Sequence, residues 1–382
     1  MGARATIALN AAILRAPRTG IGQYLAELAA ALVERDEMDF QYFTGWAWQS
    51  DLPGAPMPGY SRWSGLVKRC LPGAYQWRRH VQQQRFNSGL RLQPAALYHE
   101  PSLWPLAFDG PMVMTVHDLA HVHYPQTQPT DRLREIERLA PGGIQRASRI
   151  LVDSEFVARE LGAHYGVAQG RIVVAPLGCA SRFKPRSASE LLLPLAGFDL
   201  RPGGYLLCIG TLEPRKNLQL ALRAHALLPS AVRKSYPLVL IGMSGWRTDE
   251  FAAELERGLD SGHVRTLGYL TDEQLAQVLS GARALVFPSL YEGFGLPVLE
   301  AMASGVPVVL TRAAALPEVA GEAGTYIDAL DVEDCMQAMV RLIEDQSYWR
   351  SCQALGLERA EAFSWANCAA ITAAVYREAM ES

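Results

Sequence analysis

Short apolar runs alternate with amphipathic stretches along almost the whole of this 382-residue chain. Such alternation is typical of βα units, in which parallel strands form a sheet with helices on both faces. The chain is too long for one ordinary core, so we expect this doubly wound α/β architecture twice. The expected strands lie near residues 4–10, 95–98, 112–116, 149–153 and 171–175, and then near 205–210, 237–241, 263–267, 283–287 and 306–310.

The boundary between the two halves is marked by residues 183–190 and 201–204, which are rich in Pro, Ser and Gly. We predict an N-terminal Rossmann-like domain over residues 1–185 and a C-terminal one over 200–362. Residues 363–382 are predicted to form a helix that crosses back to the N-terminal domain. Two such sheets facing each other would leave a cleft at the carboxyl ends of their strands, where ligands bind.

Composition excludes several classes of protein. The net charge of −3 gives no global reason to expect nucleic-acid binding. Six scattered cysteines without a C-x-x-C pair indicate reduced thiols, and neither a disulfide framework nor a zinc site. The first residues resemble a short strand without the apolar region of a signal peptide, and no run approaches the ~20 apolar residues of a membrane span. We therefore expect a cytoplasmic protein.

Two carboxylates, Glu292 and Glu300, flank a glycine turn that opens a helix between two apolar strands. The free N–H groups and the positive dipole end of such a helix attract anions, while carboxylates accept hydrogen bonds from sugar hydroxyls. The combination indicates a nucleotide sugar. Alternatively, Glu292 is turn chemistry alone. Glu300 lies among apolar helix positions, where a buried carboxylate requires a partner.

Two cations, Arg215 and Lys216, follow the strand at 205–210 and precede a helix that begins near Leu218. Cations beside helix N–H groups suit a diphosphate. The alternative is that both are solvated turn residues, as charged pairs usually are.

Characteristic motifs occur in order through the second half of the chain. They are G-T-L-E-P-R-K-N at 210–217, F-P-S at 287–289, E-G-F-G-L-P-V-L-E-A-M-A-S-G-V-P at 292–307 and L-P-E-V-A-G at 316–321. Together they resemble glycosyltransferase family 4, whose members are retaining enzymes with the two-domain GT-B fold. The resemblance extends over essentially the whole chain.

The resemblance implies a role for each of these residues. Glu300 would hold the ribose hydroxyls, Glu292 would face the donor sugar, and Arg215 and Lys216 would bind the diphosphate. Many members carry Arg or Ser where this chain has Thr211, so the resemblance does not imply a second phosphate contact there. The other implied donor-site residues are Gly293, Phe294, Gly295 and Leu296 beside Glu292, and Tyr269 and Leu270, which would touch the base through backbone atoms.

Three histidines, His117, His121 and His123, follow the strand at 112–116. They could suggest a metal, but no further ligand cluster completes a coordination set and no D-x-D clamp occurs. We expect no metal and no cofactor. The resemblance makes His117 the histidine beside the donor sugar, with Asp118 helping to position sugar and acceptor. Alternatively, the histidines belong to the core.

Two glycines near the N-terminus, Gly20 and Gly22, precede a helix expected over residues 23–34. They do not complete a dinucleotide fingerprint, because Leu25 stands where its third glycine would be. The resemblance implies a glycine loop on the acceptor side, and a plain turn is the alternative. The segment at 98–101 ends another strand at the same sheet edge and could line the acceptor pocket.

Basic residues are interleaved with aromatic ones over residues 60–91, within a longer stretch that contains no acid. This pattern suits peripheral contact with an anionic membrane surface, or a lipid diphosphate acceptor. The alternative is a solvated basic helix.

From these features we predict a retaining, metal-independent glycosyltransferase. It would move a hexose of the mannose or rhamnose type from a nucleoside-diphosphate sugar, with GDP as the expected nucleotide. The acceptor would be a lipid-linked saccharide in O-antigen or other lipopolysaccharide synthesis at the cytoplasmic face of the inner membrane. The alternatives are a glucan synthase or disaccharide phosphorylase of the same fold, and a catalytically silent nucleotide-binding GT-B subunit.

Overall fold

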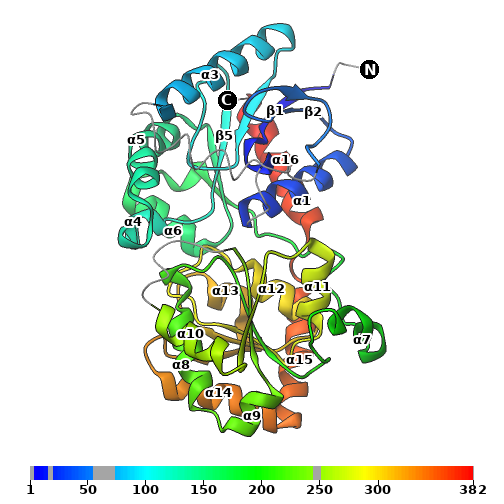
Figure 1. The fold of residues 1–382 in the computed structure, drawn as a ribbon. Coiled ribbons are helices and arrows are strands. Elements are labelled where there is room, and N and C mark those ends of the chain that lie inside the picture. The colour runs from blue at the N-terminus through cyan, green and yellow to red at the C-terminus, as the bar shows by residue number, and fades with distance from the viewer. Residues whose placement is uncertain (1–3, 16–19, 55–73, 244–250, 382) are drawn as a thin grey trace. The chain divides into compact units, whose positions relative to one another are not determined.

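The computed structural model describes residues 4–15, 20–54, 74–243 and 251–381, which form two compact units (Figure 1). The first unit comprises Met1–Leu119, Asp131–Gly178 and Trp365–Ser382. The second comprises Ala120–Thr130 and Cys179–Ser364. The chain therefore changes unit at residues 119/120, 130/131, 178/179 and 364/365.

The first unit is built on a seven-stranded sheet with the order β3-β2-β1-β4-β5-β6-β7. Neighbouring strands are parallel except β2 and β3. The order reverses between β1 and β4, as in a doubly wound fold. The strands are β1 (Thr6–Asn10), β2 (Asp39–Phe43), β3 (Trp48–Gln49), β4 (Leu97–Glu100), β5 (Met112–Val116), β6 (Arg149–Val152) and β7 (Ile172–Val174).

Helices pack against this sheet through their apolar faces. Helix α1 buries Tyr24, Leu25, Leu28 and Leu32, which recur at helical spacing along one side. It packs against α16, which also contacts β4, β5 and β6. The helices of this unit are η1 (Ala12–Arg15), α1 (Gly20–Glu34), α3 (Ala74–Leu92), α5 (Thr130–Arg146), α6 (Glu155–Tyr165), η3 (Gln169–Arg171) and α16 (Trp365–Glu381).

The second unit is built on a parallel sheet with the order β10-β9-β8-β11-β12-β13. In order of sequence this is 3-2-1-4-5-6, the arrangement of a Rossmann fold, and the order reverses between β8 and β11. Ligands are therefore expected at the carboxyl ends of these two strands. The strands are β8 (Leu206–Ile209), β9 (Leu238–Ile241), β10 (Val264–Gly268), β11 (Ala284–Phe287), β12 (Val308–Thr311) and β13 (Gly324–Ile327).

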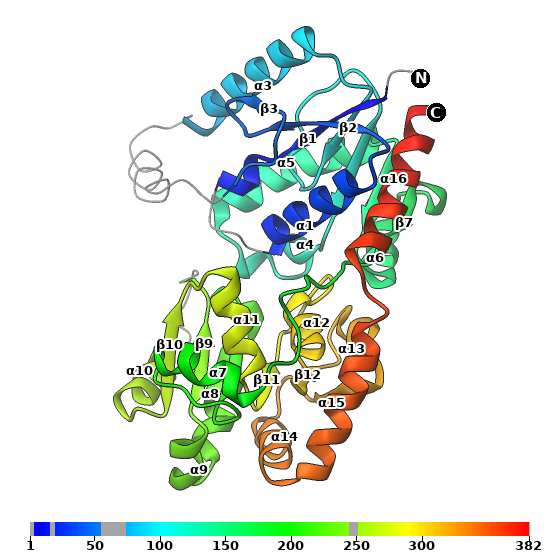
Figure 2. The ribbon, with the colours of Figure 1, turned by 90° about the vertical axis from the view of Figure 1, so that its right-hand side faces the viewer.

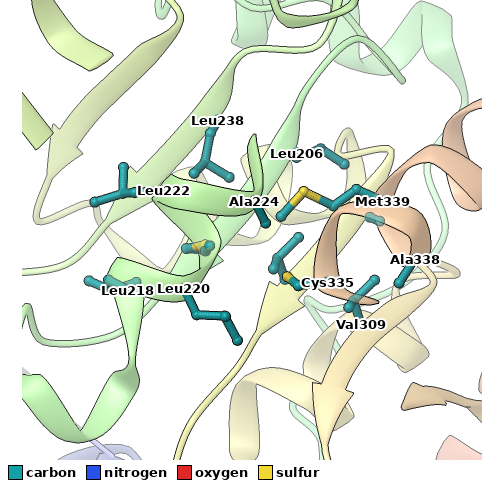
Figure 3. Packing of buried hydrophobic residues seen from close by; sticks show 14 of the residues in the cluster. Leu206, Leu218, Leu220, Leu222, Ala224, Leu238, Val309, Cys335, Ala338 and Met339 are labelled. Carbon is teal, nitrogen blue, oxygen red and sulfur yellow. The ribbon is translucent and has the colours of Figure 1, made fainter. Parts of the chain in front are cut away.

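The core of the second unit lies where α8 and α14 cover one face of the sheet (Figure 3). Alternate strand residues such as Leu206 and Leu238 meet Leu222 of α8 and Met339 of α14 there. Helices α12 and α15 pack against each other in the same unit (Figure 2), where Gly356 lies against Met302. This packing holds the helix that carries Glu300.

The helices of the second unit connect its strands and cover the sheet. They are α4 (Ala120–His123), η2 (Pro125–Thr127), α7 (Ala188–Ala196), η4 (Pro214–Lys216), α8 (Leu218–Leu227), α9 (Ser230–Ser235), α10 (Ala252–Asp260), α11 (Asp272–Ser280), α12 (Leu296–Ala303), α13 (Leu316–Ala320), η6 (Gly321–Ala323), α14 (Val332–Glu344) and α15 (Gln346–Ala360).

The predicted α/β fold of two doubly wound parallel sheets is confirmed, and the structure adds β2, β3 and β13 to the expected strands. The stretch 183–190, expected to be a linker, leads into α7, where Ser187 and Glu190 form a capping box. The long segment of the second unit begins at Cys179, whereas residues 1–185 were assigned to the first domain. Among the described helices, none is both long and apolar enough to span a membrane.

Candidate active site

Two glycines bring strand ends together at the carboxyl edge of the second sheet. Gly210 follows β8 with φ at +143°, and Gly242 follows β9 with φ at +149°. A Cβ on Gly242 would lie 1.9 Å from the carbonyl oxygen of Gly210, so no other residue fits there without moving the backbone. This close approach sets the path of the chain into the turn that carries Arg215 and Lys216.

Arg215 is held in place by two carboxylates and a backbone carbonyl. Its Nε and Nη2 donate to Oε1 of Glu213 at 3.1 and 2.7 Å. Its Nη1 donates to the carbonyl of Tyr291 at 2.6 Å and to Oε2 of Glu292 at 3.3 Å. Only 11% of the Arg215 side chain is exposed, so it is not the solvated turn residue of the alternative interpretation.

Lys216 forms a second buried pair with the same glutamate. Its Nζ donates to Oε1 of Glu292 at 2.5 Å and lies 5.2 Å from the centre of the Phe287 ring. Burial alone would raise the pKa of Glu292, but attraction to Lys216 and Arg215 outweighs burial and lowers that pKa. Glu292 is therefore a carboxylate, and the four groups Glu213, Arg215, Lys216 and Glu292 balance in charge.

A glycine turn follows Glu292 and opens α12. Gly293 and Phe294 are buried, and Gly295 caps the helix with φ at +101°. This positive φ strains any other residue at position 295, and a Cβ there would also lie 2.7 Å from Cδ2 of Leu316. The turn thus brings the first N–H groups of α12, beginning at the half-buried Leu296, to the end of β11.

The remaining predicted donor-site residues lie at the same edge of the sheet or on α12. Glu300 is 7% exposed and is flanked by the buried Leu299 and Ala301. Tyr269 and Leu270 directly follow β10, and the Gly268 carbonyl accepts a hydrogen bond from Gly242 N at 3.0 Å. Tyr269 is 46% exposed and Leu270 is buried.

In the first unit, His117 directly follows β5 and pairs with a buried aspartate. Its Nδ1 lies 2.7 Å from Oδ2 of Asp153, which comes from the end of β6. Burial would lower the pKa of His117, but the charge and hydrogen bond of Asp153 outweigh burial and raise it, and Asp118 adds to this effect. The rings of His117 and Tyr24 are arranged edge to face, with the centres 4.5 Å apart.

Behind His117 lies a chain of buried polar side chains. His99 is hydrogen-bonded through Nδ1 to Tyr376 Oη at 2.6 Å and through Nε2 to Thr115 Oγ1 at 2.8 Å. Thr115 Oγ1 is in turn hydrogen-bonded to Tyr24 Oη at 2.9 Å. Burial, with a smaller contribution from the charge of His117, lowers the pKa of His99 to about 3. His99 is therefore neutral, and this chain positions the Tyr24 ring against His117.

Sequence reasoning missed four residues of these two sites. Asp153 pairs with His117, Glu213 pairs with Arg215, and Tyr124 and Tyr291 contact each other beside Glu292. Of these, Glu213 was detectable, since it stands two residues before Arg215 in the same motif. The other pairings join distant parts of the chain.

Gly20 and Gly22, which were predicted to form a loop before a helix, lie within the helix itself. Helix α1 begins at Gly20, so Gly20 and Gly22 lie in its first turn and not in a loop before it. A Cβ on Gly20 would meet no atom of the described residues within 4 Å, so none of these residues requires glycine there. Residues 16–19, which precede this helix, lie outside the described residues.

The three histidines after β5 are divided between the two units. His117 belongs to the first unit, whereas His121 and His123 lie on α4 in the second. His121 is buried and His123 is exposed. Within the described ranges, the structure contains no group of three or more His, Cys, Asp or Glu side chains that could hold a metal ion.

The basic stretch is described only from residue 74 onwards, so residues 60–73 of the predicted membrane surface lie outside the structure's description. On α3, Trp77 is 68% exposed, whereas Phe86 is fully buried in an aromatic core with Phe43. Arg79 donates to the Pro105 carbonyl, so not every arginine of this helix is free to meet a surface.

Comparison with known proteins identifies the class. Residues 18–180 match the family described as Glycosyltransferase Family 4, and residues 203–345 match that described as Glycosyl transferases group 1. Over 370 residues the chain is 36% identical to O-antigen chain mannosyltransferase B of Escherichia coli, covering 95% of this chain and 97% of the relative. The protein is a glycosyltransferase. It belongs to glycosyltransferase family 4, as its motifs indicated.

Solved structures agree on the fold. Sucrose-phosphate synthase from Thermosynechococcus elongatus superposes with a TM-score of 0.78 at 21% identity, covering 98% of this chain and 99% of that one. HepE of Anabaena, in complex with UDP and glucose, superposes with a TM-score of 0.70 at 15% identity, covering 97% and 99%. The predicted GT-B fold is confirmed.

Proposed function

We propose that this protein is a retaining mannosyltransferase that uses a nucleoside-diphosphate sugar, with GDP as the nucleotide, and acts in O-antigen synthesis. The observation that carries the proposal is the buried cluster of Arg215, Lys216 and Glu292 at the switch point of a Rossmann sheet. The name of the Escherichia coli relative, which aligns with almost the whole chain, supports the mannosyl and O-antigen assignments. A rhamnose-type donor is the closest alternative.

The cluster suits a departing diphosphate. When the bond from the sugar to the β-phosphate breaks, negative charge develops on the phosphate and positive character on the sugar carbon. Fixed positive charge beside β8 and β11 comes from Arg215, Lys216 and the N-terminus of α12. It would stabilise the negative charge that develops on the phosphate. The HepE complex with UDP supports nucleotide binding by this fold.

The carboxylates suit the hydroxyl-rich ends of the donor. We assign Glu292, with Gly293 to Leu296, to the sugar, and Glu300 to the ribose. Binding would exchange partners: the diphosphate takes Lys216 and Arg215, and Glu292 turns its oxygens to sugar hydroxyls. Tyr269 and Leu270 would meet the base, because they follow β10 at the same edge.

The first unit would supply the remaining groups. We assign His117 to positioning the donor sugar and Asp118 to positioning the acceptor, with Asp153 holding the His117 ring by its Nδ1. His117 directly follows β5, at the carboxyl edge of the first sheet, where ligands of doubly wound folds bind. Retention would follow from attack on the face that the phosphate leaves, with the phosphate accepting the proton of the acceptor hydroxyl.

The donor is tested by nucleotide binding. In a thermal-shift panel of GDP, UDP, ADP and dTDP, we expect GDP to stabilise most, by about 2.7 kcal/mol at a hundredfold its Kd. Transfer of mannose from GDP-mannose to a lipid-linked saccharide, with retention at the anomeric carbon, would then be followed by NMR. No response to any of the four nucleotides, or inversion at that carbon, would contradict the proposal.

We propose further that catalysis needs no metal or other cofactor and that the protein works at the cytoplasmic face of the inner membrane. Fixed cations take the place of a metal at the diphosphate. EDTA should therefore leave transfer unchanged, and loss of activity restored by Mg²⁺ would contradict this. The basic and aromatic residues between 60 and 91 would bind anionic vesicles at low salt, and a protein that stays in the supernatant would exclude membrane contact.

A further inference from the structure

The loop between β11 and α12 carries Glu292 and has no regular structure, yet four successive backbone carbonyls in it are each satisfied by a different donor. Buried carbonyls of an irregular loop need such partners. In order, the carbonyls of Ser289, Leu290, Tyr291 and Glu292 accept from Thr311 Oγ1 at 2.6 Å, Tyr124 Oη at 3.2 Å, Arg215 Nη1 at 2.6 Å and Ala315 N at 3.1 Å.

Three of these donors belong to the Rossmann sheet and its connections, but Tyr124 does not. It lies in Ala120–Thr130, a segment that interrupts the first unit in sequence and belongs to the second in space. Its contacts extend beyond the hydrogen bond. The centre of the Tyr124 ring lies 5.7 Å from the centre of the Tyr291 ring. His123, on the same segment as Tyr124, has its ring centre 5.4 Å from that of Tyr291.

Arg215 contacts the same two residues, Leu290 and Tyr291, that Tyr124 contacts. The Leu290 amide donates to the Arg215 carbonyl at 2.9 Å, while its own carbonyl accepts from Tyr124. The Tyr291 carbonyl accepts from the Arg215 guanidinium, while its ring meets Tyr124 and His123. The backbone that leads into Glu292 is thus held by Arg215 and by the 120–130 segment.

We propose that Tyr124 is a positioning residue of the donor site: through Leu290 and Tyr291 it fixes the backbone from which Glu292 reaches Lys216 and the donor sugar. This role rests on the proposed function for its effect on turnover, but not for its effect on the loop. Small displacements of a positioned group lower the rate by large factors. Loss of a contact to Tyr291, next to Glu292, should therefore lower kcat.

The loop itself is tested without any substrate, by hydrogen exchange of the full-length protein. Tyr124→Phe removes only the hydroxyl, and Tyr124→Leu removes the ring contact as well. We expect the amides of residues 289–294 to exchange several-fold faster in Tyr124→Phe and faster still in Tyr124→Leu. Exchange at the wild-type rate in both variants would overturn the proposal.

Tyr205 offers a matched control. It donates its hydroxyl to the Val278 carbonyl in the same unit, but it precedes β8 and so lies at the amino end of the sheet. Tyr205→Phe loses the same kind of bond, so it should lower the melting temperature without changing exchange at 289–294. If Tyr205→Phe loosened this loop as much as Tyr124→Phe, the effect would be general and the proposal would be overturned.

Measuring kcat and the Kd for GDP distinguishes a positioning role of Tyr124 from a role in nucleotide binding. With GDP-mannose as the probe, we expect Tyr124→Phe to lower kcat about fivefold and to change the Kd for GDP less than twofold, because GDP lacks the sugar that Glu292 faces. Wild-type kcat in a variant whose loop exchanges faster would overturn the catalytic part. Absence of turnover in the wild type would instead count against the proposed function, while hydrogen exchange would still decide the role of Tyr124.

Discussion

The buried pair between Lys216 and Glu292 allows activity and stability to be separated by substitution. Lys216 Nζ lies 2.5 Å from Oε1 of Glu292, and 13% of the lysine side chain and 10% of the glutamate side chain are exposed. Lys216→Ala removes one of the two cations that keep Glu292 ionised. The glutamate keeps Arg215, whose Nη1 lies 3.3 Å from Oε2.

The two expected effects have different sizes. Losing one fixed donor to a developing charge costs ~3 kcal/mol, so kcat should fall about 100-fold. Breaking a buried pair typically costs ~3–5 kcal/mol of unfolding free energy when the remaining charge is left alone. Because Arg215 still pairs with Glu292, we expect a smaller loss of about 1–2 kcal/mol.

A double variant distinguishes these losses. Lys216→Ala with Glu292→Gln removes both members of the pair, so the unfolding free energy should recover relative to Lys216→Ala alone, whereas kcat should not. Urea unfolding measures the first quantity, and sugar transfer by purified protein measures the second. Near-normal transfer by Lys216→Ala, or recovery of transfer in the double variant, would refute the assignment of Lys216 to the diphosphate.

Three further predictions follow from the same sites. Glu300→Ala should weaken donor binding by orders of magnitude with the fold intact, as calorimetry and circular dichroism would show; unchanged donor affinity would exclude the ribose role. Because the folded-state pKa of His117 is raised, its pair with Asp153 contributes its full stability below the ordinary imidazole pKa of ~6.5 as long as Asp153 is ionised, and that stability is lost as pH rises through the raised value. The unfolding free energy should therefore fall with pH above ~6.5, more steeply than in Asp153→Asn, and equal slopes would contradict the pairing. Gly242→Ala should cost more than the ~1–3 kcal/mol of an unfavourable backbone conformation, because its Cβ would meet the Gly210 carbonyl, and a variant as stable as wild type in urea would contradict that geometry.

Much of the fold was predictable, because buried parallel strands are continuous apolar runs. β5 (M-V-M-T-V) and β11 (A-L-V-F) are of this kind, and both were expected near their observed positions. β2 (D-F-Q-Y-F) and β13 (G-T-Y-I) were missed, because polar side chains and a leading glycine interrupt the apolar pattern. Only the start of α7 fell within the predicted linker 183–190, because Pro and Ser beside its capping box resemble turn chemistry.

The candidate site was predictable where the chemistry is local in sequence. Arg215 and Lys216 follow one strand and Glu292 follows another, and parallel strands of one sheet bring their carboxyl ends to one edge. The pairing of His117 with Asp153 spans 36 residues and that of Tyr124 with Leu290 spans 166. Such pairings depend on register and packing that no local pattern encodes.

The balance of charge among Glu213, Arg215, Lys216 and Glu292 has a consequence for selectivity. A site with unpaired cations would attract any phosphate in solution. Here Arg215 and Lys216 each have a carboxylate partner within 3.3 Å. A free inorganic phosphate would have to displace Glu292 and leave it buried with nothing in exchange. Under the proposed function, a sugar nucleotide would return hydroxyls to that carboxylate, so we expect the site to favour the whole donor over free phosphate.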